Sequence, residues 1–334
     1  MTPDQRYCRA VLPRVSRTFA INIRVLSGRL GDAVRIGYLL CRSADTLEDS
    51  WSGTSVEASF ERFLRAVDGD RAAAAGLAAE ARGAGAGPDL ELLANLPRVL
   101  RAYDALPAEM CAAVRDGVRT LATGMAVYAG RAAIRPAAAP YLDTAEELED
   151  YCWVVAGCVG VMLTRLYAAA HGAGGEAAQT RRLELAPIVG RALQLTNILL
   201  DWPSDVRRGR CFVPAAWLAE VGIGPRDLVD RDRPQLRALV TRLEARALEA
   251  LARVPDYLDL IPLRHLRYRL FCLWPALWAV GSLQQARRDP EFPWGPRRPK
   301  LPRHELYRAS IGSLLTVDHG GALRRMCAAV AGGP

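Results

Sequence analysis

The sequence predicts an all-α protein, a single helical bundle over residues 1–334. Apolar residues recur at helical spacing in long stretches, and strict alternation of apolar and polar residues is nowhere sustained. Alanine and leucine, both strong helix formers, are abundant. Hydrophobic residues make up 51% of the chain, which is enough for a substantial core and excludes a disordered protein.

The predicted helices follow one another along the chain. Asp143-Thr144 precedes Glu147 in the pattern of a capping box, and Pro107 stands at the first turn of another helix. We expect helices at about 15–26, 29–49, 54–68, 89–104, 107–133, 144–171, 180–205, 233–254, 263–288 and 303–330.

Two connections differ from the rest in composition. Residues 71–87 are an Ala/Gly tract of low complexity, for which we expect a flexible surface loop. Residues 289–302 contain five prolines, which disfavour a helix, so we expect an extended loop. Neither is expected to separate two domains, because motifs that belong together lie on both sides of the first tract.

Composition narrows the classes of partner. The net charge is +8, and Lys300 is the only lysine, so arginine carries nearly all the positive charge. These arginines are scattered between apolar helices without interleaved stacking aromatics, so we expect no nucleic-acid partner. A multiply charged anionic small molecule is compatible with this charge.

The cysteines and the hydropathy pattern exclude further classes. None of the eight cysteines forms a CxxC pair or a His/Cys cluster typical of zinc sites, and most lie in apolar stretches as reduced, buried thiols do. The N-terminus lacks the apolar stretch of a signal peptide. The most apolar late segment, Leu270 to Leu283, is shorter than the roughly 20 residues of a spanning helix. We expect a cytoplasmic protein without a transmembrane segment.

Two predicted helices carry polar and acidic residues along one face, while the rest of their surface is apolar. Spacings of three and four residues place the members of each set on a single helical face. The first acidic stripe consists of Tyr38, Arg42, Asp45, Asp49 and the adjacent Glu48. The second acidic stripe consists of Gln194, Asn197, Asp201 and Asp205.

The apolar surroundings of both stripes predict that the two helices are buried. Unpaired carboxylates there would lose hydration at a cost of several kcal/mol per ion, so a positive group must face them. Mg²⁺ meets this need, because it binds one or two carboxylates and completes its shell with water and substrate phosphate. Two such helices facing each other would form a cavity with acidic groups on opposite walls.

The structural alternative is an ordinary solvated helix surface. A single acid pair at i, i+4 is a weak signal, and Asp143 with Glu147 and Glu146 with Asp150 have the same spacing without any sign of a site. Two pairs, each extended by further polar residues on an apolar helix, favour the metal-binding interpretation.

At these positions the sequence resembles the squalene and phytoene synthase family. YLLCRSADTLED is similar to the family's first aspartate-rich motif, and QLTNILLDWPSDVRRGRCFVP is similar to its second. The segment SRTF from Ser16, the YC and VAG elements from Tyr151, and FCLWPALWAVGSL also match, in the family's order, over about 16–285. The resemblance implies an isoprenoid-synthase-type helical bundle with a central apolar cavity.

The resemblance also implies roles for single residues. Tyr151 matches a tyrosine implicated in the first half-reaction, and the alternative is a core tyrosine with a satisfied hydroxyl. Contacts to the substrate diphosphates are implied for Ser16, Arg17, Tyr38, Arg42, Gln194 and Asn197. Binding of Mg²⁺, or of Mn²⁺ in its place, is implied for Asp45, Glu48, Asp49, Asp201 and Asp205.

The activity implied is the head-to-head condensation of two farnesyl diphosphates, through presqualene diphosphate, to squalene. Metal-assisted loss of pyrophosphate drives the reaction, and NADPH delivers a hydride in the second half. The chain has no Gly-rich nucleotide fingerprint. In the proline-rich loop, Arg297, Arg298 and Lys300 are candidates to close over phosphate or cofactor, and the alternative is a solvated loop. A hydrocarbon product implies peripheral contact with a membrane, and both a monomer and a homodimer stay open.

Two departures from the family's pattern leave the product open. Leu200 stands where many members have arginine, and Ser204 stands where they have an acid. Presqualene diphosphate, dehydrosqualene, phytoene and a cyclised terpene are therefore alternatives within the fold. A non-catalytic helical binding protein is the alternative of another class. A head-to-tail chain-elongating synthase is disfavoured, because its DDxxD motifs are missing.

Overall fold

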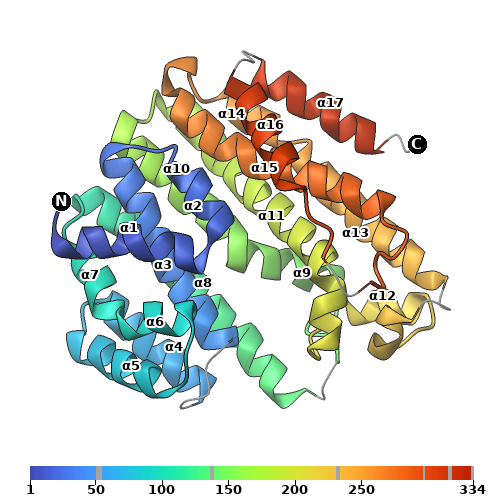
Figure 1. Cartoon of the computed structure of the whole chain (residues 1–334), viewed down its shortest axis with the longest axis horizontal. Helices are drawn as coiled ribbons and strands as arrows, with labels where there is room; N and C mark the ends of the chain where they lie inside the picture. The colour runs from blue at the N-terminus through green and yellow to red at the C-terminus, as the bar shows by residue number, and fades with distance from the viewer. Residues whose placement is uncertain (50–54, 136–138, 231–233, 296–297, 315–317, 332–334) are drawn as a thin grey trace. The chain divides into compact units, whose positions relative to one another are not determined.

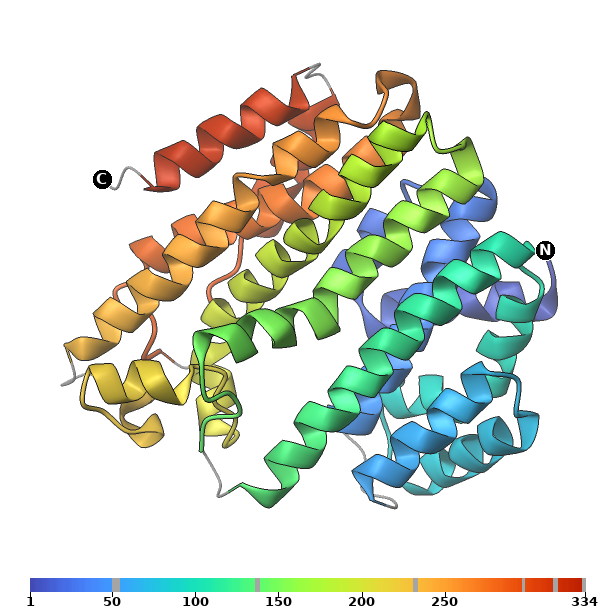
Figure 2. The same cartoon turned by 180° about the vertical axis from the view of Figure 1, so that it is seen from behind.

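A computed structural model of the chain confirms the all-α prediction (Figures 1 and 2). It describes residues 1–334 except 50–54, 136–138, 231–233, 296–297, 315–317 and 332–334. The described residues form no strand, and an isolated β-bridge joins Pro140 to Cys211. The chain divides into two compact units. The first unit comprises Met1–Ala133 and Cys158–Thr180, and the second unit comprises Ile134–Gly157 and Arg181–Pro334.

The first unit is built around the helix that carries the first acidic stripe. This helix, α3, packs against α1, α6, α7 and α10. Its Ile36, Leu39 and Leu40 are fully buried, as expected of a helix that is apolar on most of its surface. The unit consists of α1 (Pro3–Val15), α2 (Arg17–Ile23), α3 (Gly28–Asp49), α4 (Val56–Val67), α5 (Arg71–Gly83), α6 (Pro88–Ala94), α7 (Leu96–Asp104), nearly all of α8 (Ala108–Ile134), α10 (Cys158–His171) and the start of α11 (Glu176–Arg207).

In the second unit the long α15 (Leu266–Arg288) packs against α13, α14, α16 and α17. The second acidic stripe lies on α11, whose Leu195, Ile198 and Leu199 are buried. The other elements are α9 (Ala145–Cys152), the π-helical turn η1 (Trp153–Gly157), α12 (Ala215–Glu220), the 3₁₀ turns η2 (Pro225–Val229) and η3 (Leu263–His265), α13 (Gln235–Leu251), α14 (Val254–Asp259), α16 (Arg303–Leu314) and α17 (His319–Ala331).

The prediction of a flexible loop at residues 71–87 is wrong. Arg71–Gly83 form α5, because the tract is rich in alanine, the strongest helix former. The Asp70 carboxylate caps this helix by accepting hydrogen bonds from the backbone N–H groups of Ala72 and Ala73. Leu77 is fully buried, so one face of the tract belongs to the core. By contrast, the described residues of the proline-rich segment 289–302 contain no helix, as predicted.

Several helix boundaries also differ from the prediction. Residues 3–15 form a helix that was not expected, and its start is fixed by a capping box between Thr2 and Gln5. The predicted helix 89–104 is divided at Asn95 into α6 and α7. The predicted helix 303–330 is divided into α16 and α17, with residues 315–317 outside the described part.

Two helical stretches, Ala145–His171 and Glu176–Arg207, are long and apolar enough to cross a membrane. Neither is the segment Leu270 to Leu283, which the sequence marked as too short for a spanning helix. In the structure 44% and 50% of the two apolar windows are buried inside the protein, as in core helices of soluble proteins, which pass the same test of length and composition. They therefore indicate no firm membrane span.

The π-helical turn η1 lies directly after the helix that carries Tyr151, and α11 approaches it closely at Gly190. A Cβ atom at Gly190 would clash with the carbonyl oxygen of Ala156 and would lie 2.9 Å from the Cα of Gly157. Only glycine permits this approach of two backbones. Gly190 therefore fixes how close α11 comes to the turn that follows Tyr151.

We expect Gly190→Ala to lower the free energy of unfolding by about 1–3 kcal/mol, because backbone must move to admit the methyl group. Urea unfolding followed by circular dichroism measures this change. Gly312→Ala is the matched control, since Gly312 is a helical glycine of the same unit with nothing within 4 Å of an added Cβ. The control should gain about 0.5–1 kcal/mol. Equal unfolding midpoints for the two variants would contradict the close approach.

Candidate active site

The first acidic stripe begins where α1, α2 and α3 meet. Ser16 follows α1 and caps α2, because its hydroxyl accepts a hydrogen bond from the backbone N–H of Phe19 at 3.3 Å. Tyr38 of α3 lies against this cap, with its ring centroid 5.3 Å from that of Phe19. Burial raises the pKa of Tyr38 to about 12, although its hydrogen bond to Ser16 acts in the opposite direction. The structure thus places Ser16 and Tyr38 side by side.

Arg42, one turn after Tyr38, is held by two carboxylates. Its guanidinium donates two hydrogen bonds to Asp89 at 2.9 and 2.8 Å, and its Nη1 lies 3.6 Å from Asp45. Burial alone would lower the pKa of Arg42, but the hydrogen bond to Asp89 and the charge of Asp45 raise it above its ordinary value. Arg42 therefore stays charged beside the stripe. Asp89 lies in the first turn of α6 and was not among the predicted site residues.

The end of the first stripe is only partly described. Asp45 and Glu48 are half-buried on α3, and Asp49 is its last residue, with its side chain outside the described part. Arg17, predicted to contact diphosphate, is the exposed first residue of α2, next to Ser16. The structure thus places the predicted residues of the first unit on α3 and at the adjoining start of α2.

The second acidic stripe forms a half-exposed row on α11. Gln194, Asn197, Asp201 and Asp205 are all partly accessible, whereas Leu195, Ile198, Leu199 and Leu200 between them are buried. The polar row is therefore the accessible face of this part of α11.

Arg298 lies on the second acidic stripe. Its guanidinium donates a hydrogen bond to the Oδ2 atom of Asp201 at 2.5 Å and another to the Oδ1 atom of Asn197 at 2.9 Å. Burial raises the pKa of Asp201 above its ordinary value, and the charges of Arg298, Lys300 and Arg208 only partly offset that effect. Of the other two candidates in this loop, Lys300 is exposed, and Arg297 lies outside the described residues.

The two residues that depart from the family pattern have defined places on α11. Leu200 is 1% exposed and belongs to the core. Ser204 is half-buried, and its hydroxyl donates a hydrogen bond to the backbone carbonyl of Asp201 at 2.8 Å. Neither side chain adds charge to the stripe, whereas Arg298 from the loop donates a hydrogen bond to Asp201.

Tyr151 is part of an aromatic group in the second unit. It is 6% exposed, and its ring stacks on that of Phe212 with centroids 5.1 Å apart. Phe212 also meets Tyr141 edge to face at 5.2 Å. The backbone N–H of Tyr141 donates to the carbonyl of Cys211 at 2.8 Å, which holds the two segments together. Phe212 lies within the quoted second motif, but its contact with Tyr151 was not predicted.

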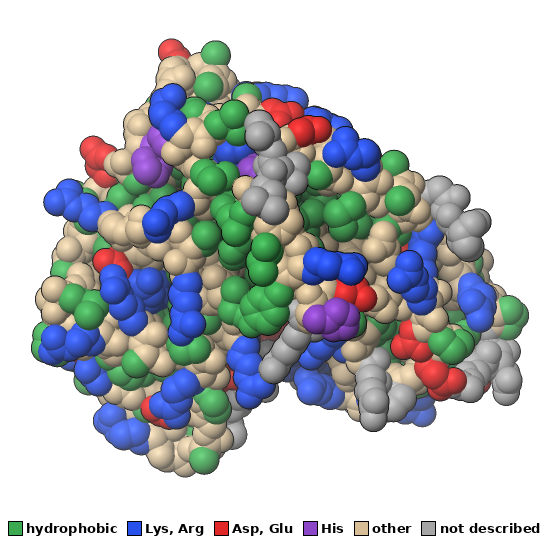
Figure 3. Space-filling model, turned by 45° about the horizontal axis from the view of Figure 1, so that its top comes forward, with side chains coloured by type: hydrophobic (Ala, Val, Ile, Leu, Met, Phe, Trp, Pro, Cys, Tyr) green, Lys and Arg blue, Asp and Glu red, His purple; other side chains and the backbone are tan. Residues whose placement is uncertain are grey.

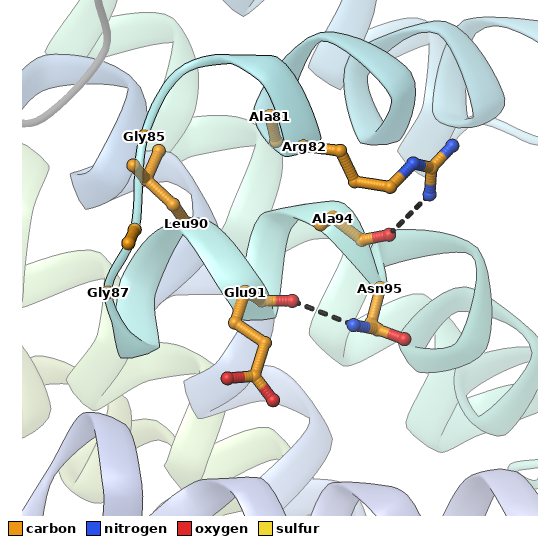
Figure 4. Close-up of a pocket in the computed structure, with 9 residues that line it drawn as sticks. Ala81, Arg82, Gly85, Gly87, Leu90, Glu91, Ala94 and Asn95 are labelled. Atoms are coloured by element: carbon orange, nitrogen blue, oxygen red, sulfur yellow. Dashed lines mark hydrogen bonds between the residues drawn. The ribbon is translucent and has the colours of Figure 1, made fainter.

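A surface hollow of the first unit lies away from the predicted residues of the acidic stripes. It has a volume of about 410 Å³ and lies where α5 turns into α6 and α7 (Figure 4). There Arg82 donates to the carbonyl of Ala94 at 3.3 Å, and Asn95 donates to the carbonyl of Glu91 at 2.9 Å. These polar side chains support the backbone, and no predicted site residue lines the hollow.

Lys and Arg side chains lie at several places on the face shown in Figure 3, among hydrophobic and acidic ones, and are most numerous on its left-hand side. Many are in ion pairs at a distance from the stripes; for example, Glu149 accepts from both Arg191 and Arg246, at 2.7 and 2.8 Å. Two arginines lie directly beside the stripes, Arg42 and Arg298.

The second acidic stripe fits a cation. The oxygens of Asp201 and Asn197 converge on one positive group, the guanidinium of Arg298, and such oxygens are the ligands that Mg²⁺ prefers. Among the described side chains no three His, Cys, Asp or Glu residues cluster tightly enough to enclose a metal ion. Mg²⁺ does not need such a cage, because one or two carboxylates, water and substrate phosphate complete its shell.

Comparison with known proteins is informative at this point. Residues 12–305 match the model of the squalene/phytoene synthase family. Human squalene synthase is 28% identical over 300 residues, which are 85% of this chain and 64% of that protein. The 15-cis-phytoene synthase of Enterobacter agglomerans is 34% identical over 152 residues, 44% of this chain and 43% of that protein. The chain thus spans less than two thirds of the length of these relatives.

A solved structure shows the same fold. The complex of TcSQS with the ligand BPH1237 matches with a TM-score of 0.81 and 25% identity, covering 98% of this chain and 92% of that one. The similarity therefore includes the helices that carry the predicted motifs and extends beyond the ends of the family match.

Asp201 should reduce the stability of the metal-free protein at neutral pH. The pKa of Asp201 is higher in the folded protein than its ordinary value of 3.8. The stability linked to its protonation is therefore fully present below pH 3.8 and is lost as the pH rises through the pKa of the folded protein. In EDTA at pH 7, Asp201→Asn should therefore unfold at higher urea concentration than the wild type. This advantage should fade as the pH falls towards 4.

Asp70→Asn is the control of opposite sign. Hydrogen bonds from the backbone N–H of Ala73 and from Arg65 lower the pKa of Asp70, so it stabilises the fold above 3.8 and this contribution is lost on acidification. That variant should be less stable than the wild type at pH 7. If Asp201→Asn also proved less stable at pH 7, the ion pair with Arg298 would outweigh the cost of burial.

Proposed function

The chain belongs to the squalene/phytoene synthase family, and on this premise we propose that it is a prenyltransferase that joins two prenyl diphosphates head to head. We propose farnesyl diphosphate as the substrate, with presqualene diphosphate as intermediate and squalene as product. The named relatives that support this choice are squalene synthases at about 28% identity. NADPH would supply the hydride for the last step.

The observation that carries the proposal is the pairing of each acidic stripe with an arginine. Asp45 lies 3.6 Å from Arg42, and Asp201 lies 2.5 Å from Arg298. A prenyl diphosphate brings anionic phosphates together with divalent cations, so its site needs carboxylates and guanidinium groups next to each other. A purely structural helix surface does not require a stripe of this kind on both helices.

In this proposal the carboxylates of each stripe bind metal ions and the other polar residues bind phosphate. Asp201 and Asp205 on α11, and Asp45, Glu48 and Asp49 on α3, would hold Mg²⁺. When bound, this ion neutralises charge that develops on the departing pyrophosphate. Arg42 would donate hydrogen bonds to phosphate oxygens, which match the geometry of a guanidinium group. Asp89 orients this guanidinium by accepting two hydrogen bonds from it. Ser16, Arg17, Tyr38, Gln194 and Asn197 would provide further polar contacts to the diphosphates.

The organic part of the reaction requires a dry environment, since water would quench an allylic cation. We assign the first half-reaction to the surroundings of Tyr151, because its buried ring stacks on Phe212 and aromatic faces stabilise a nearby cation. The double bond of the second prenyl diphosphate attacks the cation, and loss of a proton closes the cyclopropane ring. The proposed apolar cavity would separate these steps from solvent.

The identity of the product tests the proposal. Purified protein incubated with farnesyl diphosphate and Mg²⁺ should release pyrophosphate and form presqualene diphosphate, and squalene should appear only when NADPH is added. Gas chromatography with mass spectrometry and a pyrophosphate assay measure both. Dehydrosqualene, phytoene from geranylgeranyl diphosphate, or a cyclic terpene would replace squalene as the product within the same family. Absence of pyrophosphate release from every allylic diphosphate would instead support a non-catalytic binding protein.

Substitution of the stripe aspartates tests the site. Asp45→Asn and Asp201→Asn should each lower the rate of pyrophosphate release by about 10²-fold or more, because each removes charge that helps to stabilise the leaving group. Circular dichroism should show an unchanged helical content. Asp116→Asn is the control, since Asp116 is a half-exposed carboxylate paired with Arg165 on the surface of the first unit. Near-normal rates in either stripe variant would exclude that residue from the site.

A further inference from the structure

Arg298 occupies the part of the second acidic stripe where the proposed function requires a metal ion. The two terminal nitrogens of its guanidinium donate hydrogen bonds to the Asp201 carboxylate and to the Asn197 amide oxygen, which lie one helical turn apart on α11. We propose that Arg298 is an internal counter-ion that couples metal binding to pyrophosphate binding. The inference rests on the proposed function, in that the second stripe is taken to bind a metal–diphosphate substrate.

The need for a counter-ion follows from the position of Asp201. Its side chain is only 29% exposed, and its neighbours Leu200 and Trp202 are fully buried, so an unpaired charge there is costly. A guanidinium fork can satisfy a carboxylate and a neighbouring amide oxygen at once, which a lysine ammonium does less well. Arg298 thus stabilises the charged form of Asp201 when no metal ion is bound.

The segments on either side of Arg298 are fixed to the second unit. On the N-terminal side, Arg207 of α11 donates hydrogen bonds to the carbonyls of Trp294 and Gly295, the latter at 3.0 Å. On the C-terminal side, Leu301 packs against α15, where an added Cβ on Gly281 would lie 2.8 Å from its Cδ1. Anchors on both sides hold Arg298 within reach of α11, so its contact with the stripe is supported by surrounding structure.

A metal ion and Arg298 compete for the same carboxylate. Both carry positive charge, so a divalent ion bound at Asp201 displaces the guanidinium from Oδ2. Without pyrophosphate, the displaced guanidinium loses its partner and metal binding is weakened. With pyrophosphate, the same guanidinium gains phosphate oxygens as acceptors, a better match for its fork. Metal and pyrophosphate therefore strengthen each other's binding, and the coupling is reciprocal.

The experiment is a titration of the full chain with Mg²⁺, in the presence and absence of inorganic pyrophosphate, by isothermal calorimetry. Tryptophan fluorescence provides a second readout, because Trp294 lies in the same loop with the Arg237 guanidinium 5.2 Å from its ring centroid. Affinities are expressed against the concentration of free Mg²⁺, corrected for the magnesium pyrophosphate that forms in solution.

For the wild type we expect pyrophosphate to increase the affinity for Mg²⁺ by about tenfold, a typical size for coupling between two sites. Arg298→Gln should bind Mg²⁺ alone more tightly than the wild type by a similar factor, and pyrophosphate should then change its affinity by less than about threefold. Arg298→Lys keeps the charge and loses the fork, so it should show intermediate coupling. Arg308→Gln, which removes an exposed arginine from α16, should behave as the wild type.

Two results separate this inference from the proposed function. If Arg298→Gln folds normally and shows the same coupling as the wild type, the counter-ion role is wrong, while pyrophosphate release by the wild type keeps the proposed function intact. If the wild type binds neither Mg²⁺ nor pyrophosphate and releases none from farnesyl diphosphate, both fall together. Should Arg298→Gln unfold, the comparison of Arg298→Lys with the wild type decides the matter, and equal coupling in these two overturns the role of the fork.

Discussion

The cost of holding a carboxylate on a mostly buried helix governs the arrangement around both stripes. Such a charge is tolerated only beside a compensating cation. On α3 the cation is Arg42, itself fixed by Asp89, and on α11 it is Arg298. Each stripe in the metal-free protein therefore has one arginine beside its aspartates, and its surplus of carboxylates leaves a place for the cations of a metal–diphosphate substrate. The apolar residues between the stripe positions make compensation necessary, because they keep bulk water away from one side of each helix.

Much of the fold could be predicted because its main signals are local. The apolar periodicity of α3, α11 and α15 determines which faces are buried, and the spacing of Tyr38, Arg42 and Asp45 places them together. The error at residues 71–87 also has a local cause. Glycine and low complexity suggested a loop, whereas the helix propensity of alanine and the cap at Asp70 prevail. The single-domain prediction stays a prediction. The contacts within the chain divide it into two compact units.

The contacts that complete the candidate site were not predictable in the same way. Asp89 reaches Arg42 across 47 positions of sequence, and Arg298 reaches Asp201 across 97. Neither partner is marked by periodicity or spacing, because tertiary packing alone decides which side chain meets which. Phe212 was visible within the second motif, yet its stacking on Tyr151 depends on the pairing of residues near 140 and 211. The family likeness supplied roles for the motif positions and none for Asp89 or Phe212, and Arg298 was predicted as a contact to phosphate or cofactor rather than as a partner of Asp201.

The way the backbone passes between the two units limits how the protein can be divided. The chain changes unit near Ala133 within α8, at Gly157 where the π-helical turn meets α10, and near Thr180 within α11. The second and third passages lie in continuous helical segments, whereas the first lies at the C-terminal end of α8. A proteolytic or genetic cut at either of the last two would sever a helix, so neither unit is a natural fragment for expression. Stable pieces, circular permutants and insertions should instead be sought at exposed connections such as the one between α5 and α6.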